Sequence, residues 1–297
     1  MKISILSPVF NEELHIEEMI ESVQAQDHQD WEICFVDDGS TDATVAKIQA
    51  AAARDPRLRL IAHGSKLGKA AAFNRAYAAA TGEVVTILSG DDRLAPGALA
   101  TRAADLATCR PGELGMATYK LRSFSDDPAF DGMVLPRGDA TSASGGSLTF
   151  TRELAQIVFP IPEDLPSEDI WLGCAGPALS RRHIKNPTPI WEYRIHGGNS
   201  NPRHRDFERM TASIGPRHEA WRLLLEQDRF ALPEADRATL QARYAAEQHR
   251  RRGDVLGILR TPGLPLIDRL GFAGMADPRL WALRRRFYRL LSGRQGR

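Results

Sequence analysis

The sequence has few cysteines and no long apolar segment. Cys34, Cys109 and Cys174 lie far apart among 297 residues, without the paired spacing of a zinc or redox site. This favours reduced, packed thiols in a cytosolic protein. No window reaches the roughly 18 consecutive apolar residues of a membrane-spanning helix, and MKISILSPVFNEE lacks the features of an export signal. These absences predict a cytoplasmic chain without a membrane span.

The chain has almost no net charge, because 39 basic residues nearly balance 38 acidic ones and leave a formal charge of +1. The two signs are nevertheless unevenly distributed along the sequence. Residues 243–297 hold 13 Arg and 4 acidic residues, giving +9, whereas the other 26 basic and 34 acidic residues give −8. Such a tail is typical of a peripheral contact with an anionic membrane face, of a homodimer contact or of a solvated helical face. Nucleic-acid binding is not predicted, because interleaved aromatic residues and a binding motif are absent.

The first 120 residues alternate between short apolar runs and helical patterns. Strands are predicted at 2–7, 31–36, 58–62, 84–88 and 116–121, and helices at 13–25, 43–54, 70–80 and 96–106. This alternation indicates βαβ units, and therefore an α/β fold with one Rossmann-like, mostly parallel sheet flanked by helices.

The regular pattern ends after residue 121. Turn-forming residues fill 123–146, and a short helix at 151–157, a helix beginning at 170–175 and a last strand at 190–195 are predicted after them. From residue 206 onward the sequence is helical. We therefore expect a domain over 1–200, with halves at about 1–120 and 121–200, and a helical, Arg-rich extension over 201–297.

Two of the predicted strands run directly into paired aspartates. Asp37 and Asp38 lie in VDDGSTD, and Asp91 and Asp92 lie in SGDD. A helix-capping role explains Ser40 to Asp42 and is open for Asp92, but it leaves two adjacent like charges at 37 and 38 unexplained. The carboxyl ends of parallel strands hold ligands, and clustered oxygens suit Mg²⁺ or Mn²⁺ with a phosphate. The pattern predicts a polar, metal-assisted site.

Four segments in this order resemble the nucleotide-sugar half of family 2 glycosyltransferases. They are SPVFNEE (7–13), VDDGSTD (36–42), GKAAAFNRA (68–76) and LSGDD (88–92). Later residues extend the resemblance through Gly145 to Arg152, SED (167–169) and YRIHGGNS (193–200). The resemblance implies a GT-A type fold, a nucleotide-diphosphate sugar donor and inverting transfer to an acceptor hydroxyl.

The resemblance also implies roles for single residues. Nucleotide-sugar binding is expected at Pro8, Asn11, Glu12, Asp37, Asp38, Lys69, Asp91 and Asp92, and binding of Mn²⁺ or Mg²⁺ at Asp91 and His196. A structural role is the alternative for His196, and a solvated position is the alternative for Lys69. Ser89 stands where the family has the first acid of its D-x-D motif, which weakens the expected metal affinity.

The acidic segment SED resembles the catalytic motif of the family. Asp169 is expected to act as the general base that deprotonates the acceptor, and Glu168 is the close alternative. Without the resemblance, both carboxylates would be interpreted as N-terminal helix residues after a Ser167 cap.

The function expected from this resemblance is sugar transfer during surface polysaccharide or glycolipid assembly. Family frequency favours a UDP-sugar donor, and the acceptor is expected to be a glycan or lipid-linked hydroxyl reached through a peripheral contact with the inner face of the cytoplasmic membrane. A catalytically silent sugar-nucleotide or glycan-binding module is the alternative, favoured by Ser89. Nucleotidyl transfer is disfavoured, because SPVFNEE is not a Gly-rich phosphate loop.

Overall fold

The computed structural model describes the chain apart from residues 63, 166–167, 197–205, 228–229, 231 and 292–297 and the side chains of 287–291. It divides into two compact units, Met1–His196 and Gly197–Arg297. None of the described helices combines the length and the apolar content that a bilayer crossing requires.

The first half of the sheet is parallel. β1 (Ile3–Val9), β2 (Trp31–Asp37), β3 (Leu58–Ala62) and β4 (Val84–Ile87) lie in the order β3-β2-β1-β4. Nearly every residue of β1, β2 and β4 is buried, because helices cover both faces of a parallel sheet. The predictions for these four strands are confirmed to within two residues at each end.

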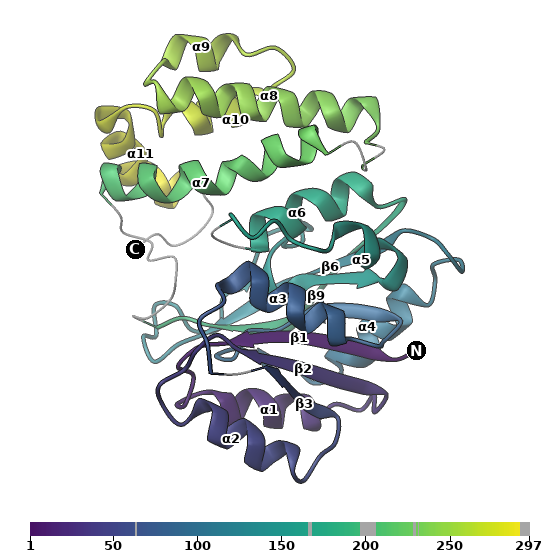
Figure 1. Cartoon of the computed structure of the whole chain (residues 1–297). Helices are drawn as coiled ribbons and strands as arrows, with labels where there is room; N and C mark the ends of the chain where they lie inside the picture. Colours follow the sequence, from purple (N-terminus) through teal and green to yellow (C-terminus); the bar gives the residue numbers. More distant parts are fainter. Residues whose placement is uncertain (63, 166–167, 197–205, 228–229, 231, 292–297) are drawn as a thin grey trace. The chain divides into compact units, whose positions relative to one another are not determined.

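Helices connect these strands and cover both faces of the sheet. α1 (Ile16–Gln24) and α2 (Thr44–Ala52) lie on one face of the sheet, and α3 (Lys69–Ala79) lies on the opposite face (Figure 1). The helix α4 (Ala98–Leu106) packs against later strands. The apolar positions of α1, at helical spacing, are all buried: Ile16, Met19, Ile20 and Val23.

The second half of the sheet is mixed. It consists of β8 (Leu148–Thr151), β6 (Gly115–Phe124), β9 (Arg182–Arg194) and β5 (Arg93–Leu94), in this order after β4, with β7 (Val134–Leu135) paired to β6. β8 is antiparallel to both neighbours, whereas β6 and β9 are parallel. A short 3-10 turn over Gly145–Ser147 leads into β8, and α5 (Arg152–Val158) and α6 (Glu168–Leu179) complete this half.

Two strands of this half differ from the prediction. β8 lies directly before the predicted short helix, and its four residues were too few to form a period. The last strand begins at Arg182 rather than at 190. Its first residues pair with β6 alone and are largely exposed, so they lack an apolar pattern and tolerate Pro187 and Pro189.

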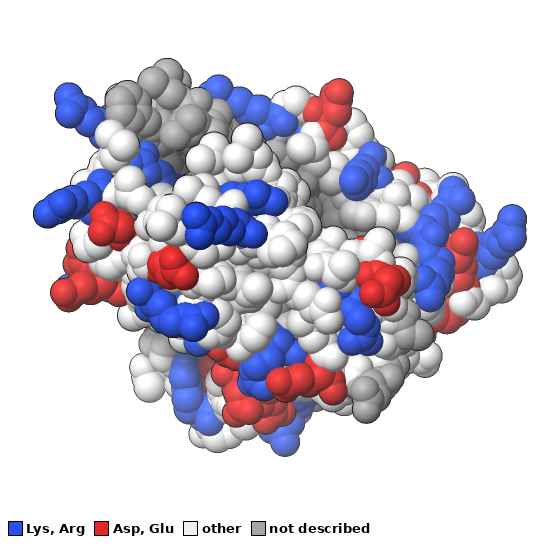
Figure 2. All heavy atoms as spheres, turned by 90° about the horizontal axis from the view of Figure 1, so that it is seen from above, with Lys and Arg blue, Asp and Glu red and all other residues white. Residues whose placement is uncertain are grey.

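The C-terminal unit is helical, as predicted. Its elements are α7 (Phe207–Glu226), α8 (Glu234–Arg251), α9 (Val255–Arg260), α10 (Leu266–Ala273) and α11 (Pro278–Leu291). In the view from above, Figure 2 shows Lys and Arg side chains dispersed among uncharged side chains and several Asp and Glu side chains. α9 and α10 were not predicted as separate helices.

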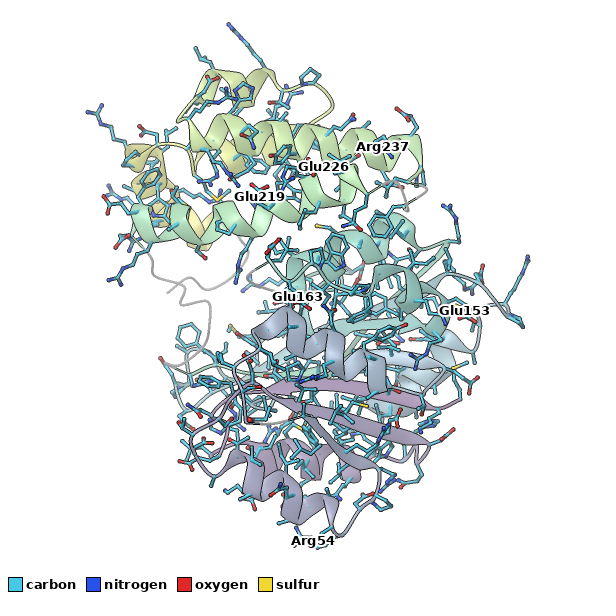
Figure 3. All side chains as sticks on the ribbon, viewed as in Figure 1. Arg54, Glu153, Glu163, Glu219, Glu226 and Arg237 are labelled. Carbon is cyan, nitrogen blue, oxygen red and sulfur yellow. The ribbon has the colours of Figure 1, made fainter. Side chains whose placement is uncertain are left out.

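A buried carboxylate joins α7 to α8. Glu247 is fully buried and accepts hydrogen bonds from His218, Arg250 and Arg251. Arg251 also pairs with Glu219, which lies on α7 on the side that faces α8 (Figure 3). Burial alone would raise the pKa of Glu247, but these partners hold it at about 2.

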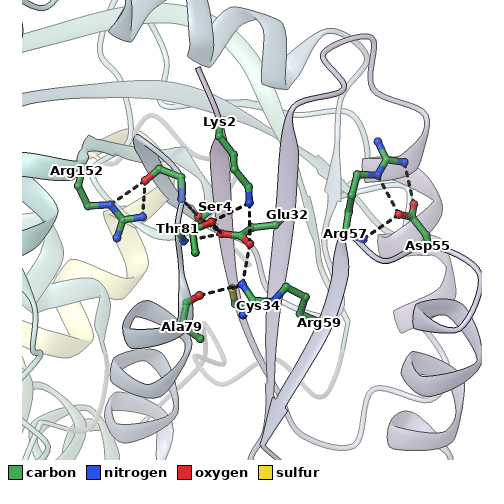
Figure 4. Close-up of polar contacts among 11 residues, drawn as sticks. Lys2, Ser4, Glu32, Cys34, Asp55, Arg57, Arg59, Ala79, Thr81 and Arg152 are labelled. Carbon is green, nitrogen blue, oxygen red and sulfur yellow. Dashed lines mark hydrogen bonds and ion pairs between the residues drawn. The ribbon is translucent and has the colours of Figure 1, made fainter.

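A second buried carboxylate lies at the amino-terminal ends of the parallel strands (Figure 4). Glu32 of β2 accepts hydrogen bonds from Ser4 at 2.7 Å, from the Thr81 amide at 2.6 Å and from Arg59 at 2.8 Å, and it pairs with Lys2 at 3.2 Å. Burial acts to raise the pKa of Glu32, but these donors lower it to about 2. The network ties β1, β2, β3 and the start of β4 together.

Candidate active site

The carboxyl ends of the parallel strands bring three of the motif segments together. Val9 is in register with Asp37, and Leu6 is in register with Ile87, so SPVFNEE, VDDGSTD and LSGDD continue from one edge of the sheet. Gly90 lies against the first segment, because an added Cβ would approach Glu12 to 2.9 Å and Val9 to 3.1 Å.

Hydrogen bonds fasten the loop after β1 to the loop after β2. The Asn11 amide donates to Ser40 at 2.9 Å, and the Asn11 side chain accepts from the Thr41 amide at 2.9 Å. Asn11 has a positive φ of 54°, which Asn tolerates better than most residues. Pro8, one step before the end of β1, is partly exposed beside Val36. Asn11 therefore positions backbone, and its predicted ligand contact stays a prediction.

The first aspartate pair is held by backbone amides. Asp37 is almost fully buried and accepts from the amides of Gly39, Ser40 and Gly64 at 3.0–3.3 Å. Burial acts to raise its pKa, and these hydrogen bonds lower it. Asp37 thus orders the loops around the site, which explains why a second carboxylate beside Asp38 is tolerated.

Asp38 reaches the loop before α3. Its Oδ1 accepts from the amides of Leu67 at 2.6 Å and Gly68 at 2.8 Å, and its Oδ2 lies 3.1 Å from Lys66 Nζ. Gly39 permits this approach, because a Cβ there would lie 3.1 Å from the Lys66 amide and φ is +85°. The contacts place Asp38 beside the N-terminus of α3.

The two aspartates of the second pair, Asp91 and Asp92, lie in different environments. The Asp91 side chain is 15% exposed, and its Oδ2 lies 3.3 Å from Nε2 of His196. Burial, followed by the charges of Asp91 and Asp42, raises the pKa of Glu12 to about 8. Glu12 is therefore mostly protonated at neutral pH, and Asp91 interacts electrostatically with both Glu12 and His196 at this edge of the sheet.

Asp92 is turned toward β9. Its carboxylate is 1% exposed and accepts from Trp191 Nε1 and from the Arg194 amide, both at 2.9 Å. Burial, followed by the neighbouring Asp91 charge, raises its pKa. These contacts give Asp92 a positioning role, and its predicted contact with the donor stays a prediction.

The predicted catalytic acids lie in the first turn of α6. Glu168 is 3% exposed and pairs with Lys69 of α3 at 2.9 Å, whereas Asp169 is less buried and accepts from the Gly145 amide at 2.9 Å. Burial, followed by the charge of Asp169, raises the pKa of Glu168 to about 7, although Lys69 acts to lower it. Ser167, the predicted cap, lies outside the described residues.

Lys69 is the group around which the predicted residues converge. Burial acts to lower its pKa, but the carboxylates of Glu168, Asp169 and Asp91 raise it. The preceding residue, Gly68, donates to Asp38. Asp38 and Glu168, from distant parts of the chain, therefore meet the N-terminus of α3, and the charges of Asp169 and Asp91 act on Lys69 there.

The side chains of the site fit a divalent cation that has few protein ligands and is coordinated mainly by the phosphate oxygens of a bound molecule. Among the described residues, no group of three or more His, Cys, Asp or Glu side chains forms a ready metal cage. Asp91 and His196 are nevertheless close, with Asp91 Oδ2 3.3 Å from His196 Nε2. Mg²⁺ commonly takes one or two protein ligands and completes its shell with phosphate oxygens and water. Ser89 adds no charge to this set.

Sequence reasoning missed several residues that hold the site. Trp191 and Arg194 hold Asp92, and the Arg194 guanidinium also donates to the Asp91 carbonyl at 2.8 Å. Arg102 of α4 is fully buried and donates to Gly146 O and Thr86 Oγ1. Burial lowers the pKa of Arg102 to about 10. Arg194 could have been identified from the sequence, because it lies inside the YRIHGGNS motif. Nothing in the sequence distinguishes Arg102 from an ordinary helical arginine.

Comparisons with known proteins define the family. Residues 4–108 match the model of glycosyl transferase family 2. An uncharacterized glycosyltransferase of Nostoc sp. is 31% identical over 220 residues, which cover 68% of this chain and 67% of that protein. The chain therefore belongs to glycosyltransferase family 2, as the motifs predicted.

The name of a second relative includes its substrate. The GalNAc(5)-diNAcBac-PP-undecaprenol beta-1,3-glucosyltransferase of Campylobacter jejuni is 38% identical over 101 residues. This match covers 34% of the present chain, and the chain spans only 33% of that enzyme's length.

Solved structures confirm the fold. S. aureus TarS 1–349 in complex with UDP-GlcNAc superposes with a TM-score of 0.62 at 20% identity, covering 98% of this chain and 86% of that one. The mannosyltransferase PcManGT from Pyrobaculum calidifontis, in complex with GDP-Man and Mn²⁺, gives a TM-score of 0.59 at 19% identity with the same coverage. The predicted GT-A type fold is thereby confirmed.

Proposed function

We propose that this glycosyltransferase transfers a sugar from a nucleotide-diphosphate donor, preferably a UDP-sugar, to an acceptor hydroxyl with inversion at the anomeric carbon. The observation that carries the proposal is the position of acidic side chains from distant segments at the N-terminus of α3, where Asp38 accepts from the Gly68 amide and Glu168 pairs with Lys69. The charges of Asp169 and Asp91 also act on Lys69. The donors bound by TarS and PcManGT, UDP-GlcNAc and GDP-Man, support the donor class.

The donor would lie along the carboxyl edge of the parallel strands. Asp38 and the loop after β1 would line the nucleoside pocket, and Lys69 would meet the diphosphate from the N-terminus of α3, where the helix dipole also favours anions. Asp91 and His196 would hold Mn²⁺ or Mg²⁺. When bound, such a cation offsets negative charge on the diphosphate. The Mn²⁺ in PcManGT supports this assignment.

Asp169 is the proposed general base. It accepts the proton of the acceptor hydroxyl while the acceptor oxygen forms a bond to the anomeric carbon and the bond from that carbon to the diphosphate breaks. The nucleoside diphosphate departs with the bonding electrons. The hydrogen bond from the Gly145 amide fixes the Asp169 carboxylate. Glu168 is the less accessible alternative, because it is buried and paired with Lys69.

The acceptor is proposed to be a glycan or lipid-linked hydroxyl in surface polysaccharide or glycolipid assembly. The lipid-linked acceptor named for the Campylobacter relative supports this class. We also propose a cytoplasmic location in which residues 201–297, the Arg-rich extension of a domain over 1–200, contact the inner face of the membrane.

Asp169→Asn tests this function. We expect the variant to bind the donor normally and to lose about 10²- to 10⁴-fold in transfer rate, because the amide cannot accept the proton. The matched control is Asp164→Asn, which changes an exposed carboxylate just before α6 and should leave both quantities unchanged. Near-normal turnover of Asp169→Asn would remove Asp169 from the role, and Glu168→Gln would then test the alternative.

A screen of donors identifies the substrate. UDP-, GDP-, dTDP- and CMP-sugars are compared for nucleotide release with and without Mn²⁺, and the anomeric configuration of the product is read by NMR. Retention of configuration would contradict the inverting mechanism. Donor binding without release or transfer from any donor would favour the silent binding module instead.

A further inference from the structure

Exposed apolar side chains gather on one helix of the C-terminal unit. Among the described residues, eight large apolar side chains are exposed, and three of them lie on α10: Leu266 at 68%, Ile267 at 78% and Leu270 at 58%. Positions i, i+1 and i+4 share one helix face, and the exposed Pro265 precedes them. Single exposed apolar residues are ordinary, whereas a contiguous group marks an interaction surface. Pro265, Leu266, Ile267 and Leu270 are called the α10 apolar face.

The α10 apolar face is presented by a well-fixed turn. Arg269 donates to the carbonyls of Leu264 at 2.7 Å and Leu259 at 2.9 Å, and so ties α10 to the preceding turn and to α9. The Leu264 side chain is buried under this turn. Asp268 is the one acidic residue between 255 and 276, and it lies 3.5 Å from Arg243 of α8. No carboxylate of this segment is therefore left without a basic partner.

Arginines precede and follow the α10 apolar face in the sequence. Arg260 is the last residue of α9 and Arg279 is the second residue of α11, and both are exposed. Residues 243–297 carry +9 in total. Figure 2 shows Lys and Arg side chains dispersed over this view of the surface, with uncharged side chains and some Asp and Glu side chains between them. An apolar face flanked by arginines is complementary to an anionic bilayer, which offers both hydrocarbon and phosphate groups.

We propose that the α10 apolar face inserts into the interfacial layer of an anionic membrane while Arg260 and Arg279 contact lipid phosphates. The inference deepens the membrane location proposed above and rests on it, by naming the residues and the two forces involved. Shallow insertion of three large side chains supplies the apolar part, and each arginine near the surface adds about fivefold in affinity. Apolar insertion alone or electrostatic attraction alone gives only weak, reversible binding, whereas the two together give firm anchoring.

Flotation of the full chain with vesicles tests the proposal. The vesicles contain phosphatidylcholine with about one third phosphatidylglycerol, a content that gives a negative surface potential. We expect the wild type to float with them, and L266Q/I267Q/L270Q to lose at least about tenfold in partitioning. R260Q/R279Q should lose about 25-fold, and about 0.5 M NaCl should weaken the wild type similarly.

Matched variants separate surface chemistry from folding. I267Q changes the most exposed residue of the face alone and should lose part of the binding, whereas L14Q changes an 82% exposed leucine of the N-terminal unit and should lose none. Equal flotation of the wild type and the triple variant would overturn the proposal. A concentration-dependent dimer that the triple variant abolishes, without vesicle binding, would also overturn it and identify a second copy as the occupant.

Nucleotide release measured without vesicles keeps the two proposals apart. The triple variant should release nucleotide at the wild-type rate in solution, because the α10 apolar face belongs to a different unit from Asp91 and Asp169. A wild type that does not float with vesicles but releases nucleotide at a normal rate would refute the membrane-docking proposal and leave the proposed sugar transfer intact. Flotation by a wild type that releases no nucleotide would refute the proposed transfer and leave docking intact.

Discussion

Replacing Glu32 by glutamine should destabilise the N-terminal unit by an amount that depends on pH. Its donors hold the pKa of Glu32 at about 2, against an ordinary value of 4.5. A difference of this size corresponds to about 3 kcal/mol of stability at neutral pH, at about 1.4 kcal/mol per unit. The substituted side chain would keep the shape but would carry no charge for Lys2 and Arg59, and its amide group would face their donors.

The pH dependence follows from the sign of the shift. Because folding lowers the pKa of Glu32, its stabilisation is complete above about pH 4.5 and is lost as the pH falls toward 2. The difference between the wild type and Glu32→Gln should therefore be largest at neutral pH and shrink in acid.

Urea unfolding of both proteins at neutral pH and near pH 3 measures this difference. Glu21→Gln is the matched control, since Glu21 is exposed on α1 and should change stability by less than about 0.5 kcal/mol. A Glu32→Gln difference as small as that of the control would refute the reasoning. So would a large difference that does not depend on pH.

The remaining predictions concern the site. Lys69→Met should raise the pKa of Glu168 above its value of about 7, because the cation that acts to lower this pKa is removed; an NMR titration of the Glu168 carboxyl group measures the change, and an unchanged pKa would show that the ion pair does not form. Gly145→Ala should lower kcat by about a hundredfold, because its Cβ would meet the Trp191 ring at 2.4 Å and displace the amide that holds Asp169. Gly138→Ala is its control, sharing a positive φ without any close neighbour, and equal losses would show that backbone strain alone is responsible. Asp91→Asn should raise the Mn²⁺ concentration for half-maximal nucleotide release by at least about tenfold, and an unchanged value would exclude Asp91 as a ligand.

The parallel half of the fold could be predicted because its signal is local. β1, β2 and β4 are buried on both faces, so they appear in the sequence as mainly apolar runs. The mixed half could not be predicted as fully. β8 has four residues, β5 has two, and the exposed start of β9 carries no apolar alternation. Their pairing depends on distant strands rather than on a local period.

The candidate site could be predicted as a set of residues but not as a set of contacts. The motifs identified Asp38, Asp91 and Asp169, and the strand order explains why the segments that carry Asp38 and Asp91 lie at one edge of the sheet. The sequence could not tell that Asp92 faces Trp191 rather than the crevice, because the direction of a side chain after a strand depends on β9. Arg102 was not identified, since a lone arginine on a helix is usually exposed.

The Lys69–Glu168 ion pair has a kinetic consequence. It connects α3, on the nucleotide side, with α6, which carries the proposed base. An arriving diphosphate would compete with Glu168 for the same ammonium group, and a displaced Glu168 would alter the charge beside Asp169. Substrate addition is therefore expected to be ordered, with the nucleotide sugar entering before the hydroxyl compound that it glycosylates.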